Sequence, residues 1–196
     1  MSIYVMRKLL IFLFSIICAT AFAQGPQNVI PVPSDVIITD GTYSFEAEPK
    51  VSVTFVKKGI APEGYELTVT PKGVKIKAST EAGAFYARQT LDQMTKDGGV
   101  KEIQCCKITD APRFPYRGLH VDVSRHFRSL DFLKKQIDAM AMFKMNRMHL
   151  HLTDAAGWRM QIDAYPRLTS FAAWHPQATW KEWWAGNRHY AEEGTD

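Results

Sequence analysis

The sequence predicts an α/β fold in two parts: a small α+β domain, in which one helix packs on a sheet, followed by a parallel βαβ unit. Two observations lead to this prediction. Between residues 27 and 108, short runs rich in β-branched residues are separated by Gly and Pro, and one stretch has helical spacing instead. After Arg113, an alternating strand, an amphipathic helix and a second alternating strand follow in succession. We expect the first domain at 24–110 and the second at 111–196.

The first 23 residues have the features of a secretory signal peptide. Arg7 and Lys8 precede the apolar run 9–18, and Ala21 and Ala23 provide the small residues of a cleavage site. A membrane anchor is the alternative, but the apolar run has about ten residues and a spanning helix needs roughly 20. We therefore expect residues 1–23 to be removed, the mature protein to be exported to the periplasm or the medium, and no membrane attachment to remain.

The composition of the mature chain argues against a nucleic-acid-binding protein and against a fold that depends on disulfides. Cleavage leaves 22 basic and 20 acidic side chains, an excess too small to indicate nucleic-acid binding. Only Cys105 and Cys106 remain, and adjacent cysteines rarely bridge because the ring they would close is strained. With 46% hydrophobic residues over the whole chain, the fold is expected to rest on burial rather than on disulfides.

The first domain is expected to be a sheet with one helix. The expected strands are 36–38, 51–56, 65–70, 74–78 and 102–108, and the expected helix is 80–94. The Pro-Lys-Gly turn at 71–73 predicts a hairpin between the third and fourth strands, and Thr80 is suited to cap the helix. Lys75 and Lys77 alternate with apolar residues, so we interpret them as part of a solvated face.

The second domain begins with a predicted βαβ unit. The strands are expected at 119–123 and 148–152, and the helix between them runs from Phe132 to Met145. Ser129 or Asp131 is suited to cap this helix, and Asn146 is expected to end it. Strands joined by such a crossover are parallel, so both carboxyl ends open on the same side of the sheet.

Two charged residues follow those carboxyl ends. Arg125 comes after the first strand and Asp154 after the second, on the side where parallel α/β folds place binding residues. An arginine offers a fork of donors to vicinal hydroxyls or a carboxylate, and an aspartate accepts from a hydroxyl or orients a histidine. The alternative is a salt bridge between Arg125 and Asp154 that only stabilises the rim.

Other candidate residues give weaker indications. His149 and His151 share one strand face, but no further ligand cluster with the spacing of a zinc site accompanies them, so we expect no metal. No phosphate-binding or dinucleotide motif occurs, and no cofactor is expected. Five tryptophans crowd the C-terminal third, suited to core packing or to stacking on sugar rings: Trp158, Trp174, Trp180, Trp183 and Trp184.

Several sequence blocks together resemble a known family. They are DAPRFPYRG at 110–118, DVSRHF at 122–127, KMN at 144–146 and HLHLTDAAGWR at 149–159. In this order they resemble the opening of the catalytic barrel in family 20 glycoside hydrolases, the β-N-acetylhexosaminidases. The preceding domain is similar to the small domain that these enzymes carry before the barrel. The resemblance implies that 111–196 is the start of a (β/α)₈ TIM barrel, of which this chain holds an incomplete, N-terminal portion.

The resemblance also implies roles for individual residues. Arg125 matches an arginine that binds hydroxyls of the terminal sugar, and Asp154 matches an aspartate that supports the hydrogen-bond network of the catalytic acid. Arg117 matches a structural arginine. The implied mechanism is substrate-assisted and retaining: the 2-acetamido carbonyl of the substrate attacks the anomeric carbon, an aspartate orients the acetamide, and an adjacent glutamate protonates the leaving oxygen.

The sequence departs from the family pattern at two places. It contains no Asp-Glu dipeptide, so no catalytic residue is assigned within this chain. Ala155 and Ala156 stand where acidic and amide residues often follow the matched aspartate. We therefore expect an exported β-N-acetylhexosaminidase acting on glycans with terminal N-acetylhexosamine, represented by a portion that does not hydrolyse glycosides alone. The alternative is a non-catalytic carbohydrate-binding or interaction module; sugar preference and oligomeric state stay open.

Overall fold

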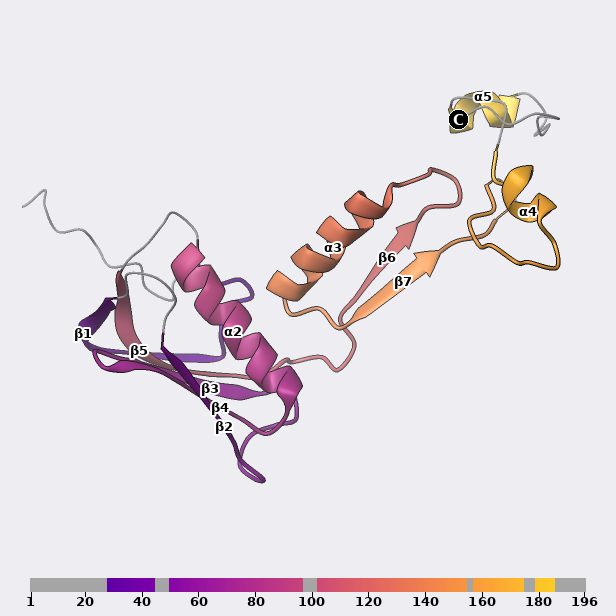
Figure 1. Cartoon of the computed structure of the whole chain (residues 1–196). Coiled ribbons are helices and arrows are strands. Elements are labelled where there is room, and N and C mark those ends of the chain that lie inside the picture. The colour runs from indigo at the N-terminus through magenta and orange to yellow at the C-terminus, as the bar shows by residue number, and fades with distance from the viewer. Residues whose placement is uncertain (1–27, 45–49, 97–101, 155–156, 175–178, 186–196) are drawn as a thin grey trace, which may run out of the picture. The chain divides into compact units, whose positions relative to one another are not determined.

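The computed structural model describes residues 28–44, 50–96, 102–154, 157–174 and 179–185 (Figure 1). The expected signal peptide at 1–23 lies outside these residues. The chain divides into two compact units between Ala111 and Pro112, and each is described by itself. Among the described residues, no helix has the length and hydropathy needed to cross a membrane.

The N-terminal unit is a five-stranded sheet with one helix. Its elements are β1 (Asp35–Ser44), β2 (Val51–Phe55), β3 (Tyr65–Thr70), β4 (Gly73–Ala78), α2 (Glu81–Lys96) and β5 (Glu102–Asp110). The strand order is β1-β5-β3-β4-β2, so the last strand in sequence lies between the first and the third. The β3–β4 hairpin is antiparallel, as the turn at 71–73 predicts, whereas β2 pairs with β4 in parallel.

The core of this unit lies between α2 and one face of the sheet (Figure 1). On β3 and β4, alternate residues are buried, and Ala84, Ala87, Leu91 and Met94 on α2 are buried too, which confirms the predicted helical spacing. Thr80 accepts the Gly83 N–H at 3.3 Å and caps α2 as expected. The opposite residues on β4, Lys75 and Lys77, are exposed.

Two neighbouring cysteines of β5 belong to this core. Cys105 and Cys106 are both buried, and neither forms a disulfide. Burial, with the neighbouring Cys105 as a smaller cause, raises the pKa of Cys106 to about 11. At neutral pH the thiol is therefore protonated, and it acts as a small apolar side chain.

The C-terminal unit begins with the predicted βαβ unit. Its elements are β6 (Gly118–Asp122), α3 (Leu130–Met142), β7 (Arg147–His151), and the short helices α4 (Arg167–Ser170) and α5 (Trp180–Ala185). β6 and β7 are parallel, and the register pairs His120 with His149 and Asp122 with His151. These features, with the five-stranded sheet before them, agree with the two-part α/β fold that the sequence predicts.

Helix α3 begins as expected but ends earlier. Ser129 accepts the Phe132 N–H and is the N-cap. The expected end at Asn146 was wrong, because the helix stops at Met142. Lys144 takes a left-handed φ of 57°, and the N–H groups of Lys144 and Met145 turn back to helix carbonyls. This is the Schellman arrangement, which usually places a glycine where Lys144 stands, so the sequence lacked its usual signal.

Arg117 holds the start of β6 against the turn that follows α3. Its Nε donates to the Lys144 carbonyl at 2.7 Å, and its backbone N–H donates to Asn146 Oδ1 at 3.0 Å. Asn146 returns the contact through its own N–H to the Arg117 carbonyl at 2.9 Å. Arg117 therefore lies at the amino end of β6, which is the opposite end from Arg125.

Candidate functional site

The candidate site lies where β6 and β7 end. Asp122 is the last residue of β6, Arg125 follows it by three residues, and Asp154 follows β7 by three residues. Arg125 Nη1 pairs directly with Asp154 Oδ2, and Arg125 Nε lies 2.5 Å from Asp122 Oδ2. The structure thus brings the two predicted residues together and adds a second carboxylate to them.

Asp122 is held as a carboxylate by its own loop. Its Oδ1 accepts the backbone N–H groups of Ser124 at 2.9 Å and Arg125 at 3.1 Å. Burial by itself would raise the pKa of Asp122. The two backbone hydrogen bonds, together with the charges of Arg125 and His151, outweigh burial and lower this pKa below its ordinary value. An ionised Asp122 in turn fixes the Arg125 guanidinium.

His151 connects the end of β7 to the same cluster. Its Nε2 lies 2.9 Å from Asp154 Oδ2, so this carboxylate oxygen contacts both His151 and Arg125. On the same face of the two-stranded sheet, the ring centroid of His120 lies 4.6 Å from that of His149 and 5.8 Å from that of His151. The described residues contain no group of three or more His, Cys, Asp or Glu side chains able to hold a metal ion.

A segment after β7 supports the loop that carries Arg125. The buried Ser124 hydroxyl donates to the Gly157 carbonyl at 2.7 Å. Arg159 donates to the carbonyls of Val123 at 2.9 Å, Ser124 at 3.3 Å and Ala173 at 2.5 Å. Its guanidinium also lies 5.3 Å from the centre of the Phe127 ring. One arginine therefore ties the end of β6 to the chain that follows β7.

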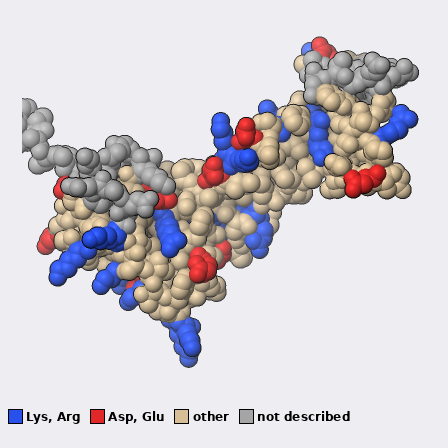
Figure 2. Space-filling model, viewed as in Figure 1, with Lys and Arg blue, Asp and Glu red and all other residues tan. Residues whose placement is uncertain are grey.

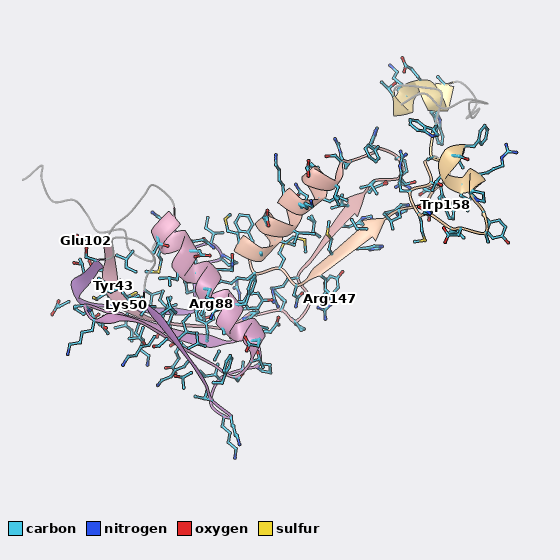
Figure 3. All side chains as sticks on the ribbon, in the orientation of Figure 1. Tyr43, Lys50, Arg88, Glu102, Arg147 and Trp158 are labelled. Atoms are coloured by element: carbon cyan, nitrogen blue, oxygen red, sulfur yellow. The ribbon has the colours of Figure 1, made fainter. Side chains whose placement is uncertain are left out.

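The tryptophans are less clearly part of this site. Trp158 is partly buried, and its indole N–H donates to the Met160 carbonyl at 2.5 Å; Figure 3 marks its position. Trp184 on α5 is 55% exposed. The side chains of Trp180 and Trp183 lie outside the described parts. Trp158 is therefore held by a contact within its own segment, whereas much of the Trp184 side chain faces solvent.

Sequence reasoning did not assign Asp122 to the site, and it considered His151 only as a possible metal ligand together with His149. Both residues were visible as polar positions of alternating strands, on the face that also carries His120 and His149. The signal that could have found them is their place at the last position of each strand, where parallel sheets collect functional side chains.

Comparisons with known proteins identify the family. Residues 53–111 match the family model "Glycosyl hydrolase family 20, domain 2", and residues 114–194 match "Glycosyl hydrolase family 20, catalytic domain". A beta-hexosaminidase of Akkermansia muciniphila is 46% identical over 158 residues, which cover 78% of this chain and 31% of the relative. An N,N'-diacetylchitobiase of Vibrio harveyi is 42% identical over 63% of this chain and 14% of its own length.

Comparison with solved structures finds enzymes of the same family. A beta-N-acetylhexosaminidase matches with a TM-score of 0.67 at 40% identity, over 76% of this chain and 31% of its own. A family 20 exo-beta-N-acetylglucosaminidase of Vibrio harveyi, solved in complex with N-acetylglucosamine, matches with a TM-score of 0.71 at 29% identity, over 81% of this chain and 32% of its own. The chain spans about a third or less of the length of these relatives. It belongs to glycosyl hydrolase family 20, of which it carries domain 2 and a part of the catalytic domain.

Proposed function

We propose that this chain supplies the sugar-binding rim of an exported β-N-acetylhexosaminidase. The reaction is hydrolysis of terminal, non-reducing N-acetylhexosamine residues of glycans, with retention and assistance by the substrate's acetamide. The observation that carries the proposal is the cluster of Arg125, Asp122 and Asp154 at the carboxyl ends of β6 and β7. Family membership supports the reaction class.

Arg125 is suited to bind vicinal hydroxyls. Asp122 and Asp154 engage its Nε and Nη1 and hold the guanidinium plane in place. These contacts use Nε and Nη1, and the N–H groups of Nη2 are suited to donate to hydroxyls of a terminal sugar. An arginine fixed before the ligand arrives loses little conformational entropy on binding.

Asp154 connects this rim to the acid-handling part of the reaction. Its Oδ2 contacts Arg125 and His151, so its orientation is set from two sides. Residues 1–196 contain no adjacent Asp-Glu pair. We therefore assign to this chain sugar binding and orientation of the Asp154 carboxylate, and no proton transfer to the leaving oxygen.

The test is hydrolysis of a chromogenic β-N-acetylglucosaminide. Residues 24–196 are expected to be inactive, and the same chain extended by a downstream sequence that contains an Asp-Glu pair is expected to be active. In the extended protein, Arg125→Ala should lower kcat/KM by roughly 10- to 150-fold, the loss of one charged hydrogen-bonding group of about 1.5–3 kcal/mol. Arg128→Ala, which removes an arginine that stacks on Phe132, is the matched control.

Two results would contradict the proposal. Hydrolysis by residues 24–196 alone would require an acid within this chain. Unchanged kinetics in Arg125→Ala would mean that Arg125 only forms a salt bridge at the rim.

The second candidate function is a non-catalytic carbohydrate-binding module, which the exposure of Trp184 favours. Sugar binding that Trp184→Ala abolishes and Arg125→Ala leaves intact would select the module.

A further inference from the structure

A groove in the N-terminal unit has no part in the site described above. It has a volume of about 800 Å³ and lies at a corner of the five-stranded sheet, where β2 starts and where β3 turns into β4. All of its lining residues lie between 50 and 75, and they include Lys50, Lys72 and Lys75 and no Asp or Glu. The described lining is therefore positively charged.

The backbone explains why three lysines meet there. Lys75 is exposed because β4 alternates, and it stands opposite Ser52 in the parallel β2–β4 register. Lys72 belongs to the hairpin turn. The Lys50 carbonyl accepts the Val74 N–H at 3.1 Å, which places Lys50 beside the start of β4.

A buried tyrosine fixes Lys50 from the other side. The Lys50 backbone N–H donates to the Tyr43 hydroxyl at 3.0 Å, and Figure 3 shows the two residues beside each other. Tyr43 is only 7% exposed. Since both the N–H and the carbonyl of Lys50 are bonded, its backbone is held in place, and only the side chain is free to follow a ligand.

The solvent-facing side of the sheet, which carries Lys75 and Lys77, is more basic near the groove. Lys107 and Lys75 both stand opposite Thr68, one on each side, so the row nearest the groove carries two cations. Glu66 lies one row further from the groove, opposite Lys77, and pairs with Lys107 at 3.8 Å. Lys and Arg side chains stand out over the strands of this unit in Figure 2. A basic end of the face therefore adjoins the groove.

The hydroxyl groups of the groove add a second chemistry. Ser52 Oγ donates to the Val74 carbonyl at 3.4 Å, and Thr70 Oγ1 donates to the Gly73 carbonyl at 3.0 Å. Because each hydroxyl uses its proton on the backbone, its oxygen is left to accept a hydrogen bond from a ligand. Pro71 provides apolar surface beside them. The groove is of the size of small-ligand pockets and is much larger than one inorganic anion needs.

We propose that this groove binds an acidic saccharide, a sugar ring that carries a sulfate ester or a carboxylate. The lysines bind the anionic group, the serine and threonine oxygens accept from ring hydroxyls, and Pro71 contacts the apolar face of the ring. The choice of a saccharide among acidic ligands rests on the proposed function. The groove itself binds without hydrolysing, and it would favour acidic glycans for the enzyme.

The experiment follows backbone amide NMR shifts of the purified full chain during titration. The probes are N-acetylglucosamine disaccharide carrying one sulfate ester, the same disaccharide without sulfate, and sodium sulfate. The sulfated disaccharide is expected to shift amides at 50–52 and 70–75 and to bind at least tenfold more tightly there than either control probe. The affinity should fall as salt is added.

Two triple variants with equal change of charge test the residues. Lys50→Gln, Lys72→Gln and Lys75→Gln together should lower the affinity for the sulfated disaccharide at least tenfold. Lys57→Gln, Lys58→Gln and Arg88→Gln, which lie outside the groove lining, should change it less than twofold. Arginine in place of all three groove lysines keeps the charge and should retain binding. Thermal unfolding checks that each variant is folded, as expected for exposed side chains.

The outcomes separate this inference from the proposed function. Equal weakening by both glutamine triples would show general charge attraction and overturn the inference, as would sodium sulfate binding as tightly as the sulfated sugar. Amide shifts near Arg125 without shifts at the groove would also overturn it while leaving the proposed function intact. If the groove amides shift while no sugar binds near Arg125, the result would support ligand binding at the groove and would contradict the proposed function.

Discussion

Ser124 donates its buried hydroxyl to the carbonyl of Gly157 at 2.7 Å, across 33 positions of sequence. The contact joins the loop after β6, which carries Arg125, to the segment after β7. Gly157 has a φ of +75°, and a Cβ there would collide with the Ser124 carbonyl oxygen. A glycine is therefore required at this place for both backbone conformation and space.

Gly157→Ala should destabilise the C-terminal unit. A non-glycine residue in a left-handed conformation costs on the order of 1–3 kcal/mol, and the collision with Ser124 adds to this. Faster amide hydrogen exchange in β6 and β7 would be the readout. Gly59→Ala is the control, because Gly59 has a φ of +91° with nothing within 4 Å of the added Cβ. If Gly157→Ala and Gly59→Ala lower the unfolding free energy of their own units equally, the collision with Ser124 does not contribute to the loss.

Acid should weaken the C-terminal unit through Asp122. The pKa of this carboxyl is lower in the folded protein than the ordinary 3.8, so the unfolded chain takes up the proton first as the pH falls. The stabilisation is complete above about pH 4 and is lost as the pH falls through the folded pKa. Unfolding followed between pH 6 and pH 2.5 should show a shallower acid slope in Asp122→Asn. Asp138→Asn, at an exposed position of α3, should keep the parent slope.

Alkali should weaken the N-terminal unit through Tyr65. Its hydroxyl lies 2.6 Å from Thr90 Oγ1 and donates to Asp110 Oδ2 at 3.0 Å. Burial first, and then the charge of Asp110, raise the pKa of Tyr65 far above its ordinary value of 10.0. The unfolded chain therefore loses this proton first, and stability falls as the pH rises above about 10.

Tyr65→Phe tests this burial directly. It leaves the fully buried Thr90 hydroxyl without this contact and should cost roughly 1–3 kcal/mol at neutral pH. Its alkaline slope of stability should be flatter than that of the parent protein. Urea unfolding at pH 7 and pH 10.5 measures both effects. Tyr116→Phe, at a 66% exposed tyrosine, should alter neither; an unchanged alkaline slope in Tyr65→Phe would show that other groups govern it.

Arg159→Lys should loosen the loop that carries Arg125. A lysine has a single ammonium group and does not span the carbonyls of Val123 and Ala173 as the arginine fork does. We expect faster hydrogen exchange in residues 123–126 and, in an extended active enzyme, a higher KM. Arg147→Lys is the control, because Arg147 is exposed at the amino end of β7 (Figure 3). Unaltered exchange in Arg159→Lys would mean that Ser124 and Gly157 hold the loop without help.

Most helices and strands could be predicted because the sequence patterns that mark them lie within a few neighbouring residues. The hairpin of β3 and β4 follows from two alternating runs and the turn at 71–73, and α2 follows from helical spacing and the Thr80 cap. β1 was predicted too short, since its second half contains Gly41 and a register shift between Ile38 and Thr42. After this shift, pairing of Thr42, Tyr43 and Ser44 with β5 supplies the hydrogen bonds that keep the end of the strand extended, and no local pattern shows it.

The candidate site could be predicted only in part. Arg125 and Asp154 were found because parallel strands bring their carboxyl ends to one side. The second carboxylate, Asp122, was not, because its role depends on backbone N–H groups of its own loop that fold back on it. Arg159 was missed for the same kind of reason: its acceptors are backbone carbonyls, which have no residue signature in a sequence.

The sequence by itself determined the two domain types, the parallel βαβ unit and the residues that mark the family, because periodicity, turns and motif order are written along the chain. Only the tertiary structure decided the strand order β1-β5-β3-β4-β2, the carboxylates around Arg125 and the convergence of Lys50, Lys72 and Lys75. These depend on contacts between residues distant in sequence. Their free energy comes from packing and register across the sheet, which no short window of sequence contains.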